Sequence, residues 1–203
     1  MIAPFCESSA GEAVELLRRG GLIAFPTETY YGLGVDPFNS QALQRLFTVK
    51  RRSSEKPVLV LITDPTRLHL LTASIPPFFS RLADRFWPGP LTLVYPCRPD
   101  LPTLLTGGTR TIGIRCSSHP AAGKIVELFN GPVTATSANI SGCRAATTAD
   151  EVQQVFGDDV DLILDNGPTP GGPGSTLVGW REGLCCLREG RISFEEILDQ
   201  AAD

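Results

Sequence analysis

The chain has 203 residues, of which 42% are hydrophobic and 20% charged, and it carries a formal net charge of −4 at pH 7. These values are typical of a globular protein with one large domain or two small ones, and the acidic balance argues against nucleic-acid binding by the whole surface. No apolar run approaches the roughly 20 residues of a membrane-spanning helix, and the N-terminus lacks the features of a signal peptide.

Apolar runs bounded by turn residues predict strands, and capping patterns followed by helical spacing predict helices. The expected strands are Leu22–Phe25, Val58–Ile62, Leu91–Tyr95, Thr111–Arg115, Val133–Thr136, Leu162–Asp165, Ser175–Trp180 and Leu184–Arg188. The expected helices begin at Ser9, Ser40, Asp64, Phe78, Pro120, Thr148 and Ser193. Residues 98–110 and 166–174 lack periodicity and are expected to be loops, the first of them mobile. The alternation of strands and helices predicts an α/β fold, and no linker divides the chain into two cores.

The stretch from Phe25 to Gly34 concentrates hydroxyl groups at the end of an expected strand. Pro26 has no N–H to donate to a sheet and should end that strand, while Gly32 and Gly34 permit close approach of the backbone. Glu28 is its one carboxylate. Because open α/β sheets bind ligands at such positions, we expect a strand-to-helix loop that carries part of a site.

The cysteines and histidines exclude several kinds of chemistry. The six cysteines are scattered without C-x-x-C spacing, so we expect neither a zinc site nor a disulfide framework, and a reducing cytoplasm fits best. His69 lies in a leucine-rich helix, and His119 precedes Pro120 at an expected helix start. With no credible base, Ser137 is not expected to be an activated nucleophile.

Polar and basic residues gather instead where an anionic ligand could bind. Thr92, Arg115 and the segment 137–139 belong to expected strands or follow them, and two basic clusters stand nearby in sequence. The clusters are Lys50/Arg52/Lys56 and Arg188. Arginines pair with phosphate or carboxylate through two parallel hydrogen bonds, and neither a Walker A nor a G-x-G-x-x-G motif is present. A site that works by positioning and charge neutralisation suits transfer at a nucleotide phosphorus.

Six motifs in order resemble the YrdC-type threonylcarbamoyl-AMP synthase family. They are Pro26–Gly34, Lys50-x-Arg52, Pro88–Thr92, Thr111–Arg115, Ser137-x-Asn139 and Ser175–Val178. The resemblance extends from the first helix to Arg188. It implies a single YrdC-like domain over residues 1–203, with a twisted, mostly mixed sheet flanked by helices and one large open cavity. The further domain of longer relatives is not expected here.

The resemblance implies a nucleotidyltransferase that condenses L-threonine, bicarbonate and ATP into threonylcarbamoyl-AMP and releases pyrophosphate. The product would serve modification of the tRNA adenosine next to the anticodon, so downstream threonylcarbamoyl-transferase proteins are expected partners, and tRNA or double-stranded RNA is a further expected contact. Mg²⁺ would accompany the ATP, without a metal site of the protein's own. We expect a cytoplasmic protein with no membrane association.

Position by position, the resemblance also implies roles for individual residues. The implied catalytic residues are Lys50, Arg52, Ser137 and Asn139. The implied ATP-binding residues are Arg52, Lys56, Thr111, Ser137 and Arg188. The implied threonine-binding residues are Thr29, Arg115 and Ser175. The chain departs from the family at Ser53, where many members have proline, and at Leu61, where many have a histidine that helps hold threonine.

Three other functions remain open at this stage. One is that of a paralogue of the same fold with an unassigned role, although such paralogues alter the segment Thr27–Thr29, which this chain keeps. A non-catalytic module for double-stranded RNA or tRNA could use the same basic concavity, with Arg45, Lys50, Arg51, Arg52 and Lys56 as its footprint. A carbamoyl-transfer relative is the third, but that role normally belongs to a larger chain with zinc-finger-like cysteines.

Overall fold

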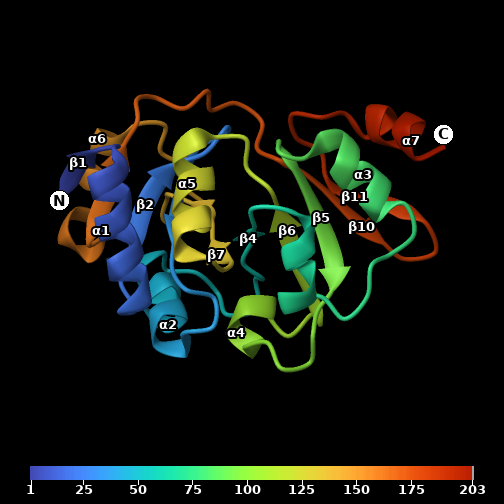
Figure 1. Ribbon diagram of the computed structural model, residues 1–203, viewed down its shortest axis with the longest axis horizontal. Coiled ribbons are helices and arrows are strands. Elements are labelled where there is room, and N and C mark those ends of the chain that lie inside the picture. Colours follow the sequence, from blue (N-terminus) through green and yellow to red (C-terminus); the bar gives the residue numbers. More distant parts are fainter. Residues whose placement is uncertain (203) are drawn as a thin grey trace.

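The computed structural model describes residues 1–202, which form two mixed β-sheets with helices packed against them (Figure 1). The strands are β1 (Ile2–Pro4), β2 (Ile23–Pro26), β3 (Tyr31–Gly34), β4 (Val60–Leu61), β5 (Leu91–Pro96), β6 (Thr111–Arg115), β7 (Val133–Thr134), β8 (Thr136–Ser137), β9 (Leu162–Asp165), β10 (Thr176–Trp180) and β11 (Leu184–Arg188). The helices are α1 (Glu7–Arg18), α2 (Ser40–Val49), α3 (Phe79–Phe86), α4 (Thr103–Thr106), α5 (Pro120–Phe129), α6 (Ala149–Phe156) and α7 (Phe194–Ala202), with short 3-10 helices at η1 (Pro65–Leu70) and η2 (Gly157–Asp159). The expected α/β class is confirmed. Among residues 1–202, none of the helices has the length and hydropathy to cross a bilayer.

The first sheet has the strand order β1-β9-β2-β3-β8 and is covered by helices on both faces. Successive side chains of a strand point to opposite faces. Ile23 and Phe25 of β2 therefore pack with the buried side chains of α1 and α5, while Leu22 and Ala24 pack on the other face with those of α2 and α6. Burial of each large side chain contributes roughly 1.5–3 kcal/mol, so both helix layers hold this sheet firmly.

The second sheet has the order β11-β10-β5-β6-β4-β7 and uses its two faces differently. On one face, Leu91, Leu93 and Tyr95 of β5 are fully buried, and the ring of Tyr95 meets Phe79 of α3 edge-on at 5.0 Å. The alternate residues of β5 and β6 line a cavity on the opposite face. They are Thr92, Val94, Thr111, Gly113 and Arg115. One face of this sheet is thus core and the other is the wall of a site.

The expected strand Val133–Thr136 is divided because the chain passes from one sheet to the other there. β7 pairs with β4 in the second sheet, and β8 pairs with β3 in the first. Between them, the backbone N–H of Ala135 donates to the carbonyl of Leu59 at 2.9 Å. This crossing places Ser137 opposite Gly32 of β3 and joins the two sheets beside the cavity.

The stretch that follows β2 forms a hairpin rather than the expected long loop. The Thr27 hydroxyl accepts hydrogen bonds from the backbone N–H groups of Thr29 and Tyr30, and β3 then pairs antiparallel with β2. Glycine disfavours strands, which is why Tyr31–Gly34 did not read as one. Gly34 is nevertheless required there, because a Cβ would lie 2.5 Å from Cε1 of Phe25.

Four further expectations need correction. α1 begins at Glu7 with Cys6 as its N-cap, and the Ser9 hydroxyl instead accepts from the Cys6 N–H at 2.9 Å. α2 is capped by Asn39, whose side chain accepts from two backbone N–H groups. The expected loop 98–110 contains α4, and only the central residues of the run 58–62 pair as a strand. The expected bounds of β6, α5, β9 and β11 are confirmed.

Candidate functional site

A cavity of about 740 Å³ is lined by residues from both sheets. Its walls come from the hairpin after β2, the polar face of β5 and β6, the segment after β7, and the ends of β10 and β11. The structure brings together most of the residues singled out in the sequence. The predicted residues that line the cavity are Thr29, Arg52, Thr111, Arg115, Ser137, Asn139, Ser175 and Arg188. Lys50 and Lys56 are not among its lining residues.

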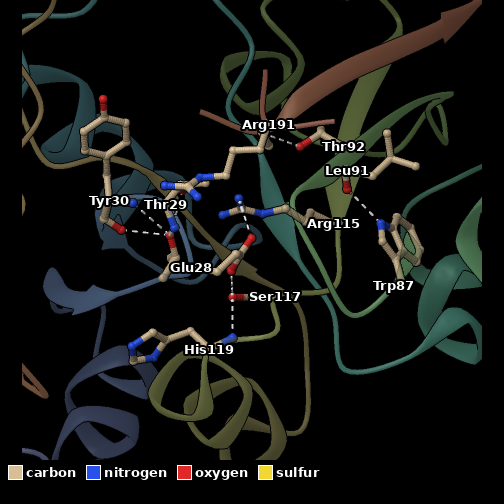
Figure 2. Close-up of polar contacts among 12 residues, drawn as sticks. Glu28, Thr29, Tyr30, Trp87, Leu91, Thr92, Arg115, Ser117, His119 and Arg191 are labelled. Atoms are coloured by element: carbon tan, nitrogen blue, oxygen red, sulfur yellow. Dashed lines mark hydrogen bonds and ion pairs between the residues drawn. The ribbon is translucent and has the colours of Figure 1, made fainter. Parts of the chain in front are cut away.

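Arg115 lines the cavity from the last position of β6. Its side chain is 3% exposed, and its Nη1 atom lies 2.9 Å from Oε1 of Glu28 (Figure 2). The buried Nε atom has no hydrogen-bond partner. Burial lowers the pKa of Arg115, the charge of Glu28 opposes that shift, and Arg188 adds to it. A guanidinium stays protonated at neutral pH, so Arg115 offers a charged N–H to an anionic group.

Several hydroxyl groups line the same cavity as Arg115. The Oγ1 atoms of Thr27 and Thr29 are 3.0 Å apart, and the hydroxyls of Thr92 and Ser175 form a hydrogen bond of 2.8 Å. The Nη2 atom of Arg188 donates to the carbonyl of Ser175 at 2.9 Å. These groups give one end of the cavity the donors and acceptors that a small polar ligand needs.

The charged side chains of the described cavity lining are all cations. Arg52, Arg144 and Arg188 all line the cavity, and among the described residues no carboxylate does. Arg52 is anchored by donating to the carbonyl of Pro57 at 2.7 Å. Burial lowers the pKa of both Arg52 and Arg188. A locally positive cavity in an acidic protein suits a polyanionic ligand.

Ser137 and Asn139 form a linked pair at the crossing between the sheets. The Ser137 hydroxyl donates to Oδ1 of Asn139 at 2.7 Å, and Nδ2 of Asn139 donates to the carbonyl of Cys143 at 2.7 Å. Both side chains are therefore held in defined orientations at the cavity wall.

The two lysines of the basic motif lie elsewhere. Lys50 is 1% exposed, and its ammonium donates to the carbonyls of Ser137 and Asn139. Burial, helped by the neighbouring charge of Arg52, lowers the pKa of Lys50 to about 7. Lys56 is exposed, and its carbonyl oxygen accepts a long hydrogen bond of 3.4 Å from Nε of Arg52. Lys50 can thus affect the site only indirectly, through its hydrogen bonds to the backbone carbonyls of Ser137 and Asn139.

Several lining residues were not singled out in the sequence. An apolar wall is built from Pro57, Val58, Leu59, Val94, Leu177 and Leu187. The alternating pattern of Leu91–Tyr95 carried a signal for Val94, because the residues between buried positions must face the other side. Arg144 carried no such signal, since it lies in an irregular segment. Leu61, the departure from the family pattern, is fully buried in the cluster with Ile23 and Phe25.

Comparisons with known proteins match this chain to a family of known fold. The Sua5/YciO/YrdC family model, described as telomere recombination, matches residues 15–190. A threonylcarbamoyl-AMP synthase of Pyrococcus abyssi is 40% identical over 186 residues, covering 91% of this chain and 55% of that protein. One of Vibrio cholerae is 35% identical over 181 residues, covering 88% of this chain and 96% of that protein.

Solved structures show the same likeness. The crystal structure of Pyrococcus abyssi Sua5 complexed with L-threonine superposes with a TM-score of 0.93 at 37% identity, covering 98% of this chain and 59% of that one. The chain therefore spans little more than half the length of the Pyrococcus relative, whereas it spans nearly all of the Vibrio relative.

Proposed function

The chain belongs to the Sua5/YciO/YrdC family, and we propose that it is a threonylcarbamoyl-AMP synthase that joins L-threonine, bicarbonate and ATP and releases pyrophosphate. The synthase names of its relatives favour this activity over a non-catalytic RNA-binding module. The reaction class is nucleotidyl transfer in the cytoplasm. The product would serve tRNA modification through downstream threonylcarbamoyl-transferase proteins, with tRNA or double-stranded RNA as a further contact.

The end of the cavity around Arg115 suits an amino acid. The unpartnered Nε of Arg115 can donate to the α-carboxylate, and a charged hydrogen bond of this kind contributes about 1.5–3 kcal/mol. The hydroxyls of Thr29 and Ser175 line the same region and can bind the polar groups of threonine. A relative of this fold has been crystallised with L-threonine, which supports the assignment.

The cationic part of the cavity suits the triphosphate. Arg52 and Arg188 would screen its negative charge, and Thr111, Ser137 and Asn139 would hold the nucleotide by hydrogen bonds. The apolar wall offers a surface for the adenine ring. Lys50 would support this binding indirectly, by fixing the backbone of Ser137 and Asn139.

The observation that carries the proposal is the position of Arg188. It donates a hydrogen bond to Ser175, a residue assigned to threonine binding, and its charge contributes to the lowered pKa of Arg115. It also lines the cavity together with Arg52, which is assigned to ATP binding. The two assigned subsites therefore adjoin, as a condensation requires.

The chemistry can be written from the substrates. The amine of threonine attacks bicarbonate or CO₂ to give a carbamate, with loss of water in the bicarbonate case. A carbamate oxygen then attacks the α-phosphorus, and the bond to the β-phosphate breaks with release of pyrophosphate. Charge screening by Arg52 and Arg188 would stabilise the leaving group. Magnesium would enter as part of the MgATP substrate, because the described cavity lining offers it no carboxylate.

The test is pyrophosphate release from ATP, with threonine and bicarbonate each omitted in turn. We expect release only when all three substrates are present. Release that does not depend on threonine would overturn the substrate assignment. Salt-sensitive RNA binding without any pyrophosphate release would favour the RNA-binding module instead.

A further inference from the structure

Glu28 is a partly buried carboxylate next to a residue of the cavity lining, and the proposed function gives it no role. It lies in the turn between β2 and β3, and its side chain is 13% exposed. Its neighbour Thr29 lines the cavity, but Glu28 is not among the lining residues. The side chain turns instead toward the end of β6, where Arg115 and Ser117 lie (Figure 2).

One oxygen of Glu28 forms an ion pair without a hydrogen bond, and the other accepts a hydrogen bond. Oε1 lies 2.9 Å from Nη1 of Arg115, and Oε2 accepts a hydrogen bond from the Ser117 hydroxyl. The Ser117 hydroxyl in turn accepts from the backbone N–H of His119 at 3.3 Å, at the start of α5. The carboxylate is thus held between β6 and a helix start, behind Arg115. It is placed to orient that guanidinium rather than to touch a ligand.

The turn that carries Glu28 is well fixed. The N–H of Thr27 donates to the carbonyl of Tyr30 at 3.0 Å, and the Thr27 hydroxyl donates to the same carbonyl at 2.8 Å. The carbonyl of Thr29 accepts from the N–H of Gly171 at 2.8 Å. Because hydrogen bonds fix the backbone of this turn, the carboxylate that it carries can hold the Arg115 guanidinium in one position.

A counter-ion is needed to stabilise the charge of Arg115, which is buried and lies near another cation. Arg188 is the nearby cation that lowers the pKa of Arg115, and burial acts in the same direction. In the described part of the chain, Glu28 supplies the ion pair of Arg115. It lies beside Nη1 and leaves the buried Nε without a partner, and in the proposed function the guanidinium donates to the substrate carboxylate.

We propose that Glu28 is a positioning residue that holds the Arg115 guanidinium for the α-carboxylate of the amino-acid substrate. This inference rests on the proposed function and deepens it, because it identifies what orients the group that recognises threonine. Two neighbouring residues of this turn would then have different roles. Thr29 would contact the ligand, and Glu28 would contact Arg115, which binds the ligand.

The test compares the KM values of Glu28→Ala and Glu28→Gln in pyrophosphate release. In Glu28→Ala the guanidinium loses its anchor, so we expect the KM for threonine to rise about tenfold or more and the KM for ATP to change by less than about twofold. The amide of Glu28→Gln can still accept from Arg115, so it should recover most of the threonine KM. An unchanged threonine KM in Glu28→Ala, or equal rises for both substrates, would overturn the proposal.

Asp161→Ala provides the matched control. Asp161 forms an ion pair with Arg45 at 2.6 Å, and neither residue lines the cavity. This variant should lower the melting temperature without a selective change in the threonine KM. A selective rise in the control would show that loss of stability alone produces the effect, and would overturn the proposal.

Calorimetric titration with L-threonine separates this inference from the proposed function. If the wild-type protein binds threonine but releases no pyrophosphate, the proposed function fails, and weaker threonine binding by Glu28→Ala would still support the positioning role. If the wild-type enzyme is active and Glu28→Ala binds threonine equally well, only the positioning role fails. If the wild-type protein binds no threonine, both fail.

Discussion

The ammonium nitrogen of Lys50 lies 2.8 Å from the backbone carbonyl oxygen of Asn139, and it also donates to the carbonyl of Ser137. This contact ties the end of α2 to the segment that crosses between the two sheets. The resemblance implied a catalytic role for Lys50. The structure places it behind the cavity wall, with its donors directed to the backbone that carries Ser137 and Asn139.

Replacing Lys50 should therefore affect stability as well as activity. Lys50→Met removes the donor from two partly buried hydrogen bonds, to the carbonyls of Ser137 and Asn139, and each group left without a partner costs about 1–3 kcal/mol. We expect the free energy of unfolding to fall by about 3 kcal/mol in urea denaturation. Lys56→Met is the control, because that side chain is exposed and should change stability by less than about 0.5 kcal/mol. Equal stability of the two variants would contradict the role of Lys50.

Arg51 carries backbone strain between Lys50 and Arg52. Its φ angle is +49°, a region that residues other than glycine rarely adopt. Arg51→Gly should relieve the strain and raise the free energy of unfolding by about 0.5–1 kcal/mol. Part of this gain is offset because glycine increases the conformational entropy of the unfolded chain. Arg51→Ala removes the same side chain but keeps the strain, so it should show no such gain. Denaturant titration of both variants decides the matter, and a greater stability of the alanine variant would refute it.

His119 should make stability depend on pH. Its side chain caps α5 by accepting from the N–H of Ala121, which requires a neutral imidazole. Burial lowers the pKa of His119 from its ordinary 6.5, and the charge of Glu28 opposes the shift. The unfolded chain therefore binds a proton first on acidification. The stability contributed by the neutral cap is complete above pH 6.5 and is lost as the pH falls through the lower, folded-state pKa.

The expected loss at His119 is no more than about 1 kcal/mol, the usual contribution of a cap. His119→Asn keeps a capping side chain that does not titrate. Unfolding free energies measured between about pH 7.5 and 5 should fall more steeply for the wild type than for this variant. Parallel pH profiles for the two proteins would show that His119 is not the titrating cap.

Arg115 should be intolerant of a change that keeps its charge. Lysine lacks the planar fork and the Nε donor of arginine, so Arg115→Lys loses the hydrogen bond to the α-carboxylate and the fixed contact with Glu28. A loss of about 1.5–3 kcal/mol corresponds to a rise of roughly one to two decades in the threonine KM. Steady-state pyrophosphate release at saturating ATP measures it. Wild-type threonine KM in Arg115→Lys would remove Arg115 from the amino-acid site.

Much of the fold followed from local patterns. The strand Thr111–Arg115, the helix Pro120–Phe129 and the cap at Thr148 agree with the structure, because apolar spacing and capping chemistry act over a few residues. The strand Tyr31–Gly34 was missed because its glycines are explained only by a neighbour, the ring of Phe25. The division of Val133–Thr136 was missed for a similar reason, since it depends on which sheet each half joins.

In the site, too, local sequence motifs indicated the residues involved but not their tertiary contacts. Family motifs indicated which residues converge, and most of them line one cavity. They could not show that Lys50 is buried behind Ser137 and Asn139, or that Glu28 faces Arg115, because those contacts join residues far apart in sequence. Burial and hydrogen-bond partners decide whether a charged residue touches a ligand or orients one that does.

A crystal structure of the protein with L-threonine and a non-hydrolysable ATP analogue would test the central claim most directly. We predict that the threonine carboxylate lies within hydrogen-bond distance of Nε of Arg115, and that the triphosphate lies beside Arg52 and Arg188 in the same cavity. Threonine or nucleotide bound outside this cavity, or a triphosphate that contacts neither Arg52 nor Arg188, would contradict the account.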